Sequence, residues 1–171
     1  MTERKVRKML IKELGKKDVA LLQTFLLWLT PTALKTWYHY GTTFTRQNVE
    51  TILANSDYKL ACLEKNKIVA LGHLHDFAWK FYPEREIHHR RVRICRLGIV
   101  SGITGQGYGT LLLMELIEKS RLLKPPVEEI YLSVSAENKA AVKLYSNFGF
   151  KIIQEFNDRA QTNYEMVKKL D

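Results

Sequence analysis

The stretch that decides the fold runs from residue 98 to residue 119, GIVSGITGQGYGTLLLMELIEK. An apolar, strand-like run breaks into glycines at every second position, Gly105, Gly107 and Gly109, and then continues with helical periodicity. A glycine turn that opens a helix gathers unpaired N–H groups at the positive end of the helix dipole, and glycine lets an anion approach without meeting a Cβ. The stretch therefore predicts a phosphate cradle between a strand and a helix.

Other glycine loops fit this stretch less well. The P-loop requires four residues between its glycines followed by Lys and Ser or Thr, whereas Thr110 and Leu111 follow Gly109. The dinucleotide fingerprint G-x-G-x-x-G requires glycine at position 110 and usually follows the first strand of a parallel unit, not the fourth strand as here. A glycine turn without a ligand is the remaining alternative. Three glycines in the first turn of a helix lower its stability by up to about 1 kcal/mol each, which favours a functional use.

Composition limits the class of protein. With 171 residues, 46% of them hydrophobic, the chain can bury the core of one domain, expected to span 1–171. Cys62 and Cys95 lie in apolar strand-like runs and no export signal is evident, so we expect a cytoplasmic protein with free thiols. No apolar stretch is long enough for a membrane span. The net charge of +9 could serve to bind nucleic acid or an acidic small molecule, or only to keep the protein soluble. The basic residues are spread along the whole chain, which favours the last of these.

The remaining sequence alternates between strand and helix patterns. It shows no internal repeat, linker or low-complexity tract. The expected strands cover 8–14, two runs of a hairpin around 65–67 within 58–79, then 88–100, 128–135, 150–156 and 164–170; the expected helices cover 16–29, 31–41, 45–56 with Thr45 as cap, 107–120 and 138–149.

Four segments taken together resemble a known family. LGIV (97–100), TGQGYGTLLL (104–113), IYLSVS (130–135) and ENKAAVKLYSNFGF (137–150) are similar to the core motifs of the GNAT superfamily of acetyl-CoA-dependent N-acetyltransferases, and the resemblance is strong from 92 to 155. It implies an α/β fold with a mixed, mostly antiparallel twisted sheet of six to seven strands, splayed between strands 4 and 5 and flanked by helices on both faces. It also implies acetyl transfer from acetyl-CoA to a primary amine by direct attack in a ternary complex.

The resemblance assigns cofactor contacts to three segments. The backbone of the fourth strand's end would pair with the pantetheine arm like an added strand. Backbone amides of the glycine loop would hold the pyrophosphate. On the last helix, Asn138 would cap the cofactor side and meet the pantetheine, and Ala141 would be small enough to let it pass. The expected cofactor-binding residues are Leu97, Gly98, Ile99, Thr104, Gly105, Gln106, Gly107, Tyr108, Gly109, Thr110, Asn138 and Ala141. No metal site is predicted.

The same resemblance points to Tyr145 as the proton donor to the departing thiolate. Tyr145 lies seven residues after Asn138, about two helical turns, so the two share a helix face. A Tyr hydroxyl beside the sulfur can stabilise the charge as it forms without being ionised itself. The alternative is a core aromatic residue.

The chain departs from the family pattern at two places. Thr104 stands where Arg or Gln usually begins the loop, so affinity for the cofactor could be lower. The positions where several family members carry a Glu or His base hold Arg93 and Cys95, and neither is a credible base.

The candidates left for the base are His73, His75, His88, His89 and a water chain. We favour His73, since it shares its strand face with Val69 and Leu71 and points to a packed, partly dry environment.

The acceptor amine stays open among small amines, aminosugars, polyamines and protein amines. Trp37, Tyr38 and Tyr40 and the loop 77–90 would form the walls of its site; each of these aromatics could also fill the core. The cluster HHRRVR (88–93) could favour an acidic acceptor, although the phosphates of CoA could also account for much of the basic surface. The sequence shows no RNA-binding signature, and it leaves open whether the protein forms a homodimer. The alternative function is a GNAT-fold module that binds acyl-CoA or regulates, without catalysis.

Overall fold

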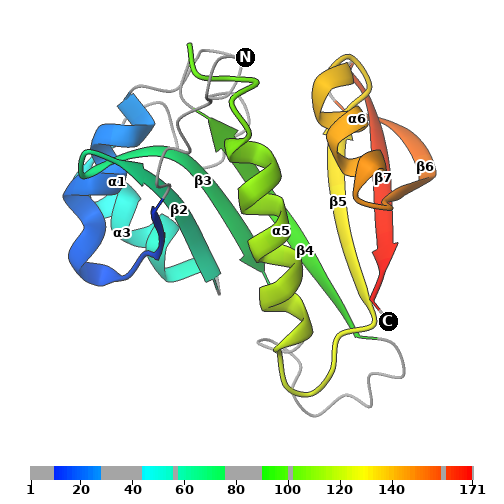
Figure 1. The fold of residues 1–171 in the computed structure, drawn as a ribbon, viewed down its shortest axis with the longest axis horizontal. Coiled ribbons are helices and arrows are strands. Elements are labelled where there is room, and N and C mark those ends of the chain that lie inside the picture. Colours follow the sequence, from blue (N-terminus) through cyan, green and yellow to red (C-terminus); the bar gives the residue numbers. More distant parts are fainter. Residues whose placement is uncertain are drawn as a thin grey trace, which may run out of the picture.

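The computed structural model describes residues 10–27, 44–55, 58–75, 90–99, 102–158 and 161–170. Its strands form one sheet in the order β1-β2-β3-β4-β5-β7-β6 (Figure 1). The strands are β1 (Leu10–Glu13), β2 (Tyr58–Glu64), β3 (Lys67–His75), β4 (Arg91–Ile99), β5 (Glu129–Ser135), β6 (Lys151–Asp158) and β7 (Gln161–Lys169). The helices are η1 (Lys16–Asp18), a 3-10 turn, and the α-helices α1 (Val19–Leu27), α3 (Arg46–Asn55), α5 (Tyr108–Arg121) and α6 (Lys139–Asn147).

Helices cover both faces of the sheet, as predicted. On β2, Leu60 and Cys62 belong to a buried cluster shared with α5 and α6, whereas Ala61 and Leu63 belong to a second cluster shared with α1 and α3. This division follows from the strand period of two, which turns successive side chains to opposite faces. We call the two sides the α5 face and the α1 face.

The sheet is splayed between β4 and β5, which confirms the expectation for strands 4 and 5. These two strands are the parallel pair, and they pair over three residues, from Arg91↔Glu129 to Arg93↔Tyr131. Figure 1 shows them together at the lower end of the sheet and apart at the upper end, where α5 begins and α6 lies. Each of the other pairs in the sheet is antiparallel. The split therefore opens beside the two segments that carry the family motifs.

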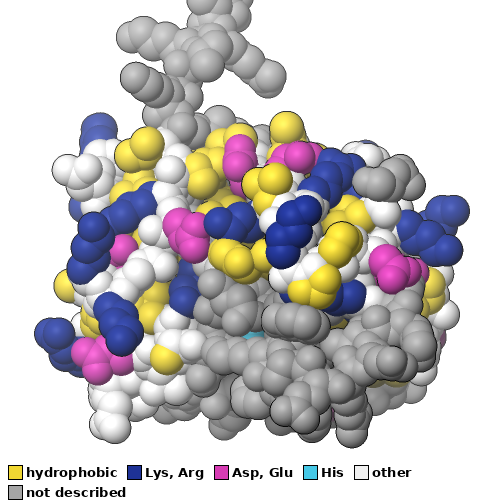
Figure 2. All heavy atoms as spheres, turned by 90° about the horizontal axis from the view of Figure 1, so that it is seen from below, with side chains coloured by type: hydrophobic (Ala, Val, Ile, Leu, Met, Phe, Trp, Pro, Cys, Tyr) yellow, Lys and Arg dark blue, Asp and Glu magenta, His cyan; other side chains and the backbone are white. Residues whose placement is uncertain are grey.

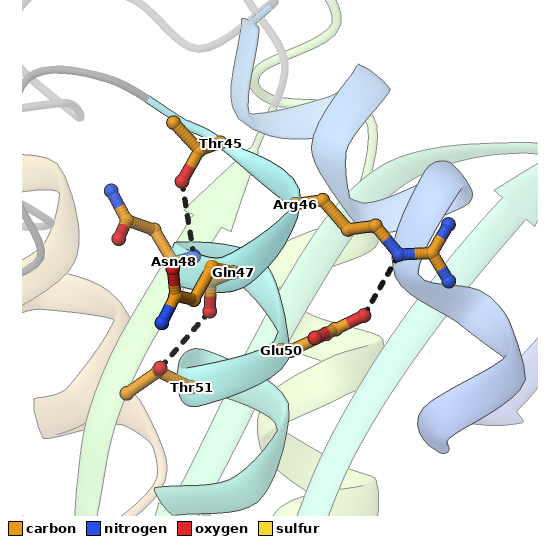
Figure 3. A network of polar contacts seen from close by, with 6 residues as sticks. All are labelled: Thr45, Arg46, Gln47, Asn48, Glu50 and Thr51. Carbon is orange, nitrogen blue, oxygen red and sulfur yellow. Dashed lines mark hydrogen bonds and ion pairs between the residues drawn. The ribbon is translucent and has the colours of Figure 1, made fainter.

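The described helices and strands outside the motifs match the predicted ones, with small differences in where they begin and end. The helix expected at 16–29 begins as the 3-10 turn η1 before α1. α3 begins after Thr45, whose hydroxyl accepts a hydrogen bond from the Asn48 amide at 3.3 Å, so the expected cap is present (Figure 3). An Arg46–Glu50 ion pair of 2.9 Å follows on the same helix. The helix expected at 31–41 lies outside the described residues.

The β2–β3 hairpin forms without the strong Asn-Gly turn signal. Lys65 and Asn66 take up its two central positions with φ of 47° and 60°. Positive φ at both positions matches the right-handed twist of the flanking strands. Asn tolerates this conformation better than most residues, which lets the turn form where the sequence offers no glycine.

Candidate active site

Gly105 and Gly107 adopt backbone conformations that favour glycine. Their φ values are 79° and 92°, and a Cβ added at either position would meet no atom within 4 Å. Gly107 is the N-cap of α5 and provides no side-chain cap, and the helical hydrogen bonds begin with the Leu111 amide and the Gly107 carbonyl at 3.0 Å. Amides that precede the first helical bond have no acceptor inside the helix. The loop therefore offers backbone donors and open space together, which suits an anion.

Gly109 has a different role from the other two glycines. A Cβ there would lie 3.2 Å from Ile99 Cδ1 and 3.4 Å from Leu144 Cδ2. Gly109 thus lets α5 pack closely against β4 and α6. Within the predicted cradle, Gly109 can therefore contribute its backbone amide, whereas its missing Cβ makes room for β4 and α6.

The end of β4 runs along the split. Leu97, Gly98 and Ile99 pair with β3 through Gly72, Leu71 and Ala70, and in the described part of the chain β4 pairs with β5 only as far as Arg93. The second edge of this segment therefore borders the opening between the strands. That edge is where an extended ligand could add itself as a strand.

α6 places two motif residues on the other side of the split. Asn138 is the N-cap, and its Oδ1 accepts a hydrogen bond from the Ala141 amide at 3.1 Å. Tyr145 is 7% exposed, and its ring lies 5.9 Å from that of Phe150. Burial raises the pKa of Tyr145 to about 12, so its hydroxyl keeps its proton throughout the neutral range.

His73 is fully buried, with 0% of its surface exposed, and His75 is half-buried. Both follow Leu71 on the α1 face, whereas Gly72 and Leu74 face α5. The reason we gave for His73 is half right. A β-bulge in the β2–β3 pairing, where Cys62 pairs with Ala70 and Leu63 with Ile68, places Val69 against the α5-face cluster instead.

A group of charged and aromatic side chains occupies the α1 face where β4 and β5 pair. Arg91 pairs with Glu129 at 3.2 Å and Glu165 at 3.5 Å, and its guanidinium lies 4.8 Å from the ring centre of Tyr131. Arg93 also lies over Tyr131, at 5.9 Å. The signal that could have revealed Tyr131 is the alternation of IYLSVS, whose even-numbered residues are buried.

Arg91 and Arg93 lie far from the glycine loop. Arg93 lies six residues before Ile99, about 20 Å along an extended strand, so it is remote from the glycine loop. The phosphates of a ligand in that loop cannot explain Arg91 and Arg93. Figure 2 shows, on the described part of the face seen from below, cationic side chains interspersed with acidic and apolar ones.

Several predicted residues lie outside the described ones. They are Trp37, Tyr38, Tyr40, His88, His89 and nearly all of the loop 77–90. None of the described helices is long and apolar enough to cross a membrane. Of the described His, Cys, Asp and Glu residues, no group of three is placed to hold a metal ion.

The structure therefore combines a splayed mixed sheet, a glycine loop at the start of α5 and a buried tyrosine on α6. Residues 22–150 match the acetyltransferase (GNAT) family, and the chain belongs to this family. It is therefore an acyltransferase, as the resemblance implied.

Solved structures of similar fold cover nearly the whole chain. An acetyltransferase of the GNAT family from Streptococcus pneumoniae is 24% identical with a TM-score of 0.70, covering 96% of this chain and 100% of that one. Arabidopsis thaliana NAA60 in complex with acetyl-CoA is 14% identical with a TM-score of 0.70, over 95% and 99%. The spermidine/spermine N-acetyltransferase SpeG from Vibrio cholerae is 19% identical with a TM-score of 0.66, over 95% of both. The curated proteins contain no match.

Proposed function

We propose that this acyltransferase transfers the acetyl group of acetyl-CoA to a primary amine by direct attack in a ternary complex. The observation that carries the proposal is that, among the described residues, β4 and β5 pair only as far as Arg93 and then part beside the glycine loop at the start of α5 and beside α6, which carries Tyr145. A similar fold has been solved with acetyl-CoA bound, which supports this donor.

In this proposal the cofactor follows the split. The amides from Gly105 to Thr110 hold the pyrophosphate, and the backbone of 97–99 pairs with the pantetheine arm. Asn138 uses Oδ1 for its own helix cap, so its amide nitrogen is the group that would meet a pantetheine carbonyl. Ala141, half-buried on the next turn, leaves room beside it. Thr104 is exposed and would contribute a hydroxyl where a longer side chain is usual.

Tyr145 acts as hydrogen-bond donor to the thiolate as the carbon–sulfur bond breaks. Thiols have pKa values of roughly 8.5, well below the value of about 12 for the Tyr145 hydroxyl, so a complete proton transfer would be uphill. The hydroxyl therefore stabilises the developing negative charge while remaining protonated. Its burial strengthens that interaction, because little water competes for the sulfur.

The amine must lose a proton before or during its attack. An amine with pKa near 10.4 is only about 0.1% neutral at pH 7.4. We propose His73 as the base, reached from the α1 face while the thiol leaves on the α5 face. His73 pairs with Arg96 of β4, so β4 lies between His73 and the split. In this proposal a water therefore carries the proton from the amine to His73.

Replacing His73 by Gln tests the base. If His73 accepts the proton, log kcat/KM of the unaltered enzyme rises with pH to a plateau near an imidazole pKa, and His73→Gln loses that limb. Steady-state rates between pH 5.5 and 10 measure it, with His75→Gln as the matched control on the same strand face. If both variants keep the limb and the rate follows the acceptor amine's own ionisation, solvent and not a histidine takes the proton.

Mixing the protein with acetyl-CoA and a panel of amines tests the function itself. We expect free CoA thiol to be released only with acceptor present, detected with a thiol reagent, and at least one of the small amines, aminosugars, polyamines or peptide amines to accelerate release. We propose that the acceptor site is lined by Trp37, Tyr38 and Tyr40. The panel therefore also tests which amines bind to aromatic side chains. Binding of acetyl-CoA without thiol release for any amine would favour the alternative, an acyl-CoA-binding module without catalysis.

A further inference from the structure

Tyr108 differs from its neighbours in the glycine loop. Residues 104–107 are exposed, whereas the Tyr108 side chain is 2% exposed. Its ring belongs to the α5-face cluster, and its hydroxyl donates a hydrogen bond to Oε1 of Glu64. The first residue of α5 is therefore attached to the sheet both by packing and by a polar contact.

Glu64 occupies a place where the sheet otherwise buries apolar side chains. On β2, Leu60 and Cys62 are buried against α5, and Glu64 is the next residue on that face, at the end of the strand. A carboxylate there contributes little apolar packing. It can, however, accept a hydrogen bond that is roughly twice as strong as one between neutral groups.

The loop needs such an attachment because of its glycines. Gly102, Gly105 and Gly107 all have positive φ and no Cβ contact that would hold them. Glycine backbone has more conformations to lose than any other, so a loop of this kind binds an anion well only if its ends are fixed. β4 fixes the upstream end and Tyr108 the downstream end.

We propose that Glu64 is a positioning residue for the phosphate loop. Through the Tyr108 hydroxyl it fixes the start of α5, so that the amides from Gly105 to Thr110 are oriented before the cofactor arrives. This inference rests on the proposed function, since that function makes a pyrophosphate the ligand of the loop. It concerns the cofactor side alone, because Tyr145 and His73 do not contribute to the contact.

Calorimetric titration with CoA tests the proposal. Tyr108→Phe and Glu64→Leu each remove the hydrogen bond, and each is expected to weaken CoA binding about tenfold. Because both substitutions remove this shared hydrogen bond, the loss in the double variant should be smaller than the sum of the two single losses. Glu64→Gln keeps an oxygen acceptor and should restore binding. In the cofactor-free protein, the amides of 105–110 should exchange hydrogen faster in Tyr108→Phe.

Glu13→Leu is the matched control. It removes the 3.0 Å contact of Glu13 with Lys119, which also ties α5 to the sheet but far from the loop, and should leave the Kd for CoA unchanged. In steady-state assays, Tyr108→Phe and Glu64→Leu should raise KM for acetyl-CoA while kcat and the KM for the acceptor stay unchanged.

Two results overturn the positioning role alone: unchanged Kd in both single variants, or equal damage by Glu64→Gln and Glu64→Leu. Unaltered protein that binds no CoA refutes the proposed function and this inference together.

Discussion

Tyr145→Phe is expected to lower kcat by roughly 10- to 1000-fold while the affinity for acetyl-CoA stays nearly unchanged. The substitution removes one hydroxyl and keeps the ring, so the contact with Phe150 and the burial of α6 are preserved. The loss falls on kcat because the hydrogen bond to sulfur gains strength only as the thiolate forms. Steady-state kinetics at saturating acetyl-CoA, with calorimetric Kd values, measure both quantities.

Tyr164→Phe serves as the matched control, because Tyr164 is half-buried and packs against the same α5-face cluster. It should keep full turnover. Equal rates for Tyr145→Phe and the unaltered enzyme would leave Tyr145 as a core aromatic residue.

The raised pKa of Tyr145 also sets the pH dependence. In its proposed role the Tyr145 hydroxyl has to be protonated, and with a pKa of about 12 it stays so up to about pH 11, so we expect it to add no alkaline limb to the rate below that pH. The unfolded chain releases this proton near pH 10. Ionisation of Tyr145 therefore leaves the free energy of unfolding unchanged below pH 10 and lowers it as the pH rises from 10 towards 12.

Gly107→Val is expected to weaken acetyl-CoA binding at least 100-fold while the fold survives. The Cβ at position 107 would meet no protein atom, so its branched side chain would occupy the space that the phosphate requires. The positive φ of 92° adds a folding cost of about 1–2 kcal/mol, which shows as a lower Tm. Calorimetry measures the binding and circular dichroism the fold.

Gly102→Val separates ligand exclusion from backbone strain. Gly102 has φ of 83° and equally open surroundings, but it lies before the segment 105–110. Both variants should lose similar stability, and only Gly107→Val should lose the cofactor. Matched affinities in the two variants would show that the cradle is not at Gly107.

The local signals of the sequence were strong where backbone chemistry itself makes the structure. Glycines before a helical period predicted the loop and the start of α5. The resemblance to the family implied Asn138 as the cap of the last helix, and its Oδ1 makes that cap. These features depend on residues close in the chain. Their geometry follows from propensity and hydrogen bonding alone.

The strand faces could not be predicted in the same way. A strict period of two put Val69 beside Leu71 and His73, but the bulge after Ile68 breaks that period. A bulge is decided by the partner strand, which the local sequence does not contain. His73 does share its strand face with Leu71, as expected, but not with Val69.

The sequence by itself determined the order of the elements, the family and the open backbone of Gly105 and Gly107. Only the tertiary structure decided that Gly109 serves close packing, that Glu64 meets Tyr108 across 44 residues of chain, and that Arg91 joins Glu129 and Glu165. The physical reason is the range of the interactions. Backbone conformation and capping are fixed within a turn, whereas side-chain contacts between elements depend on strand register and helix placement, which the whole core sets.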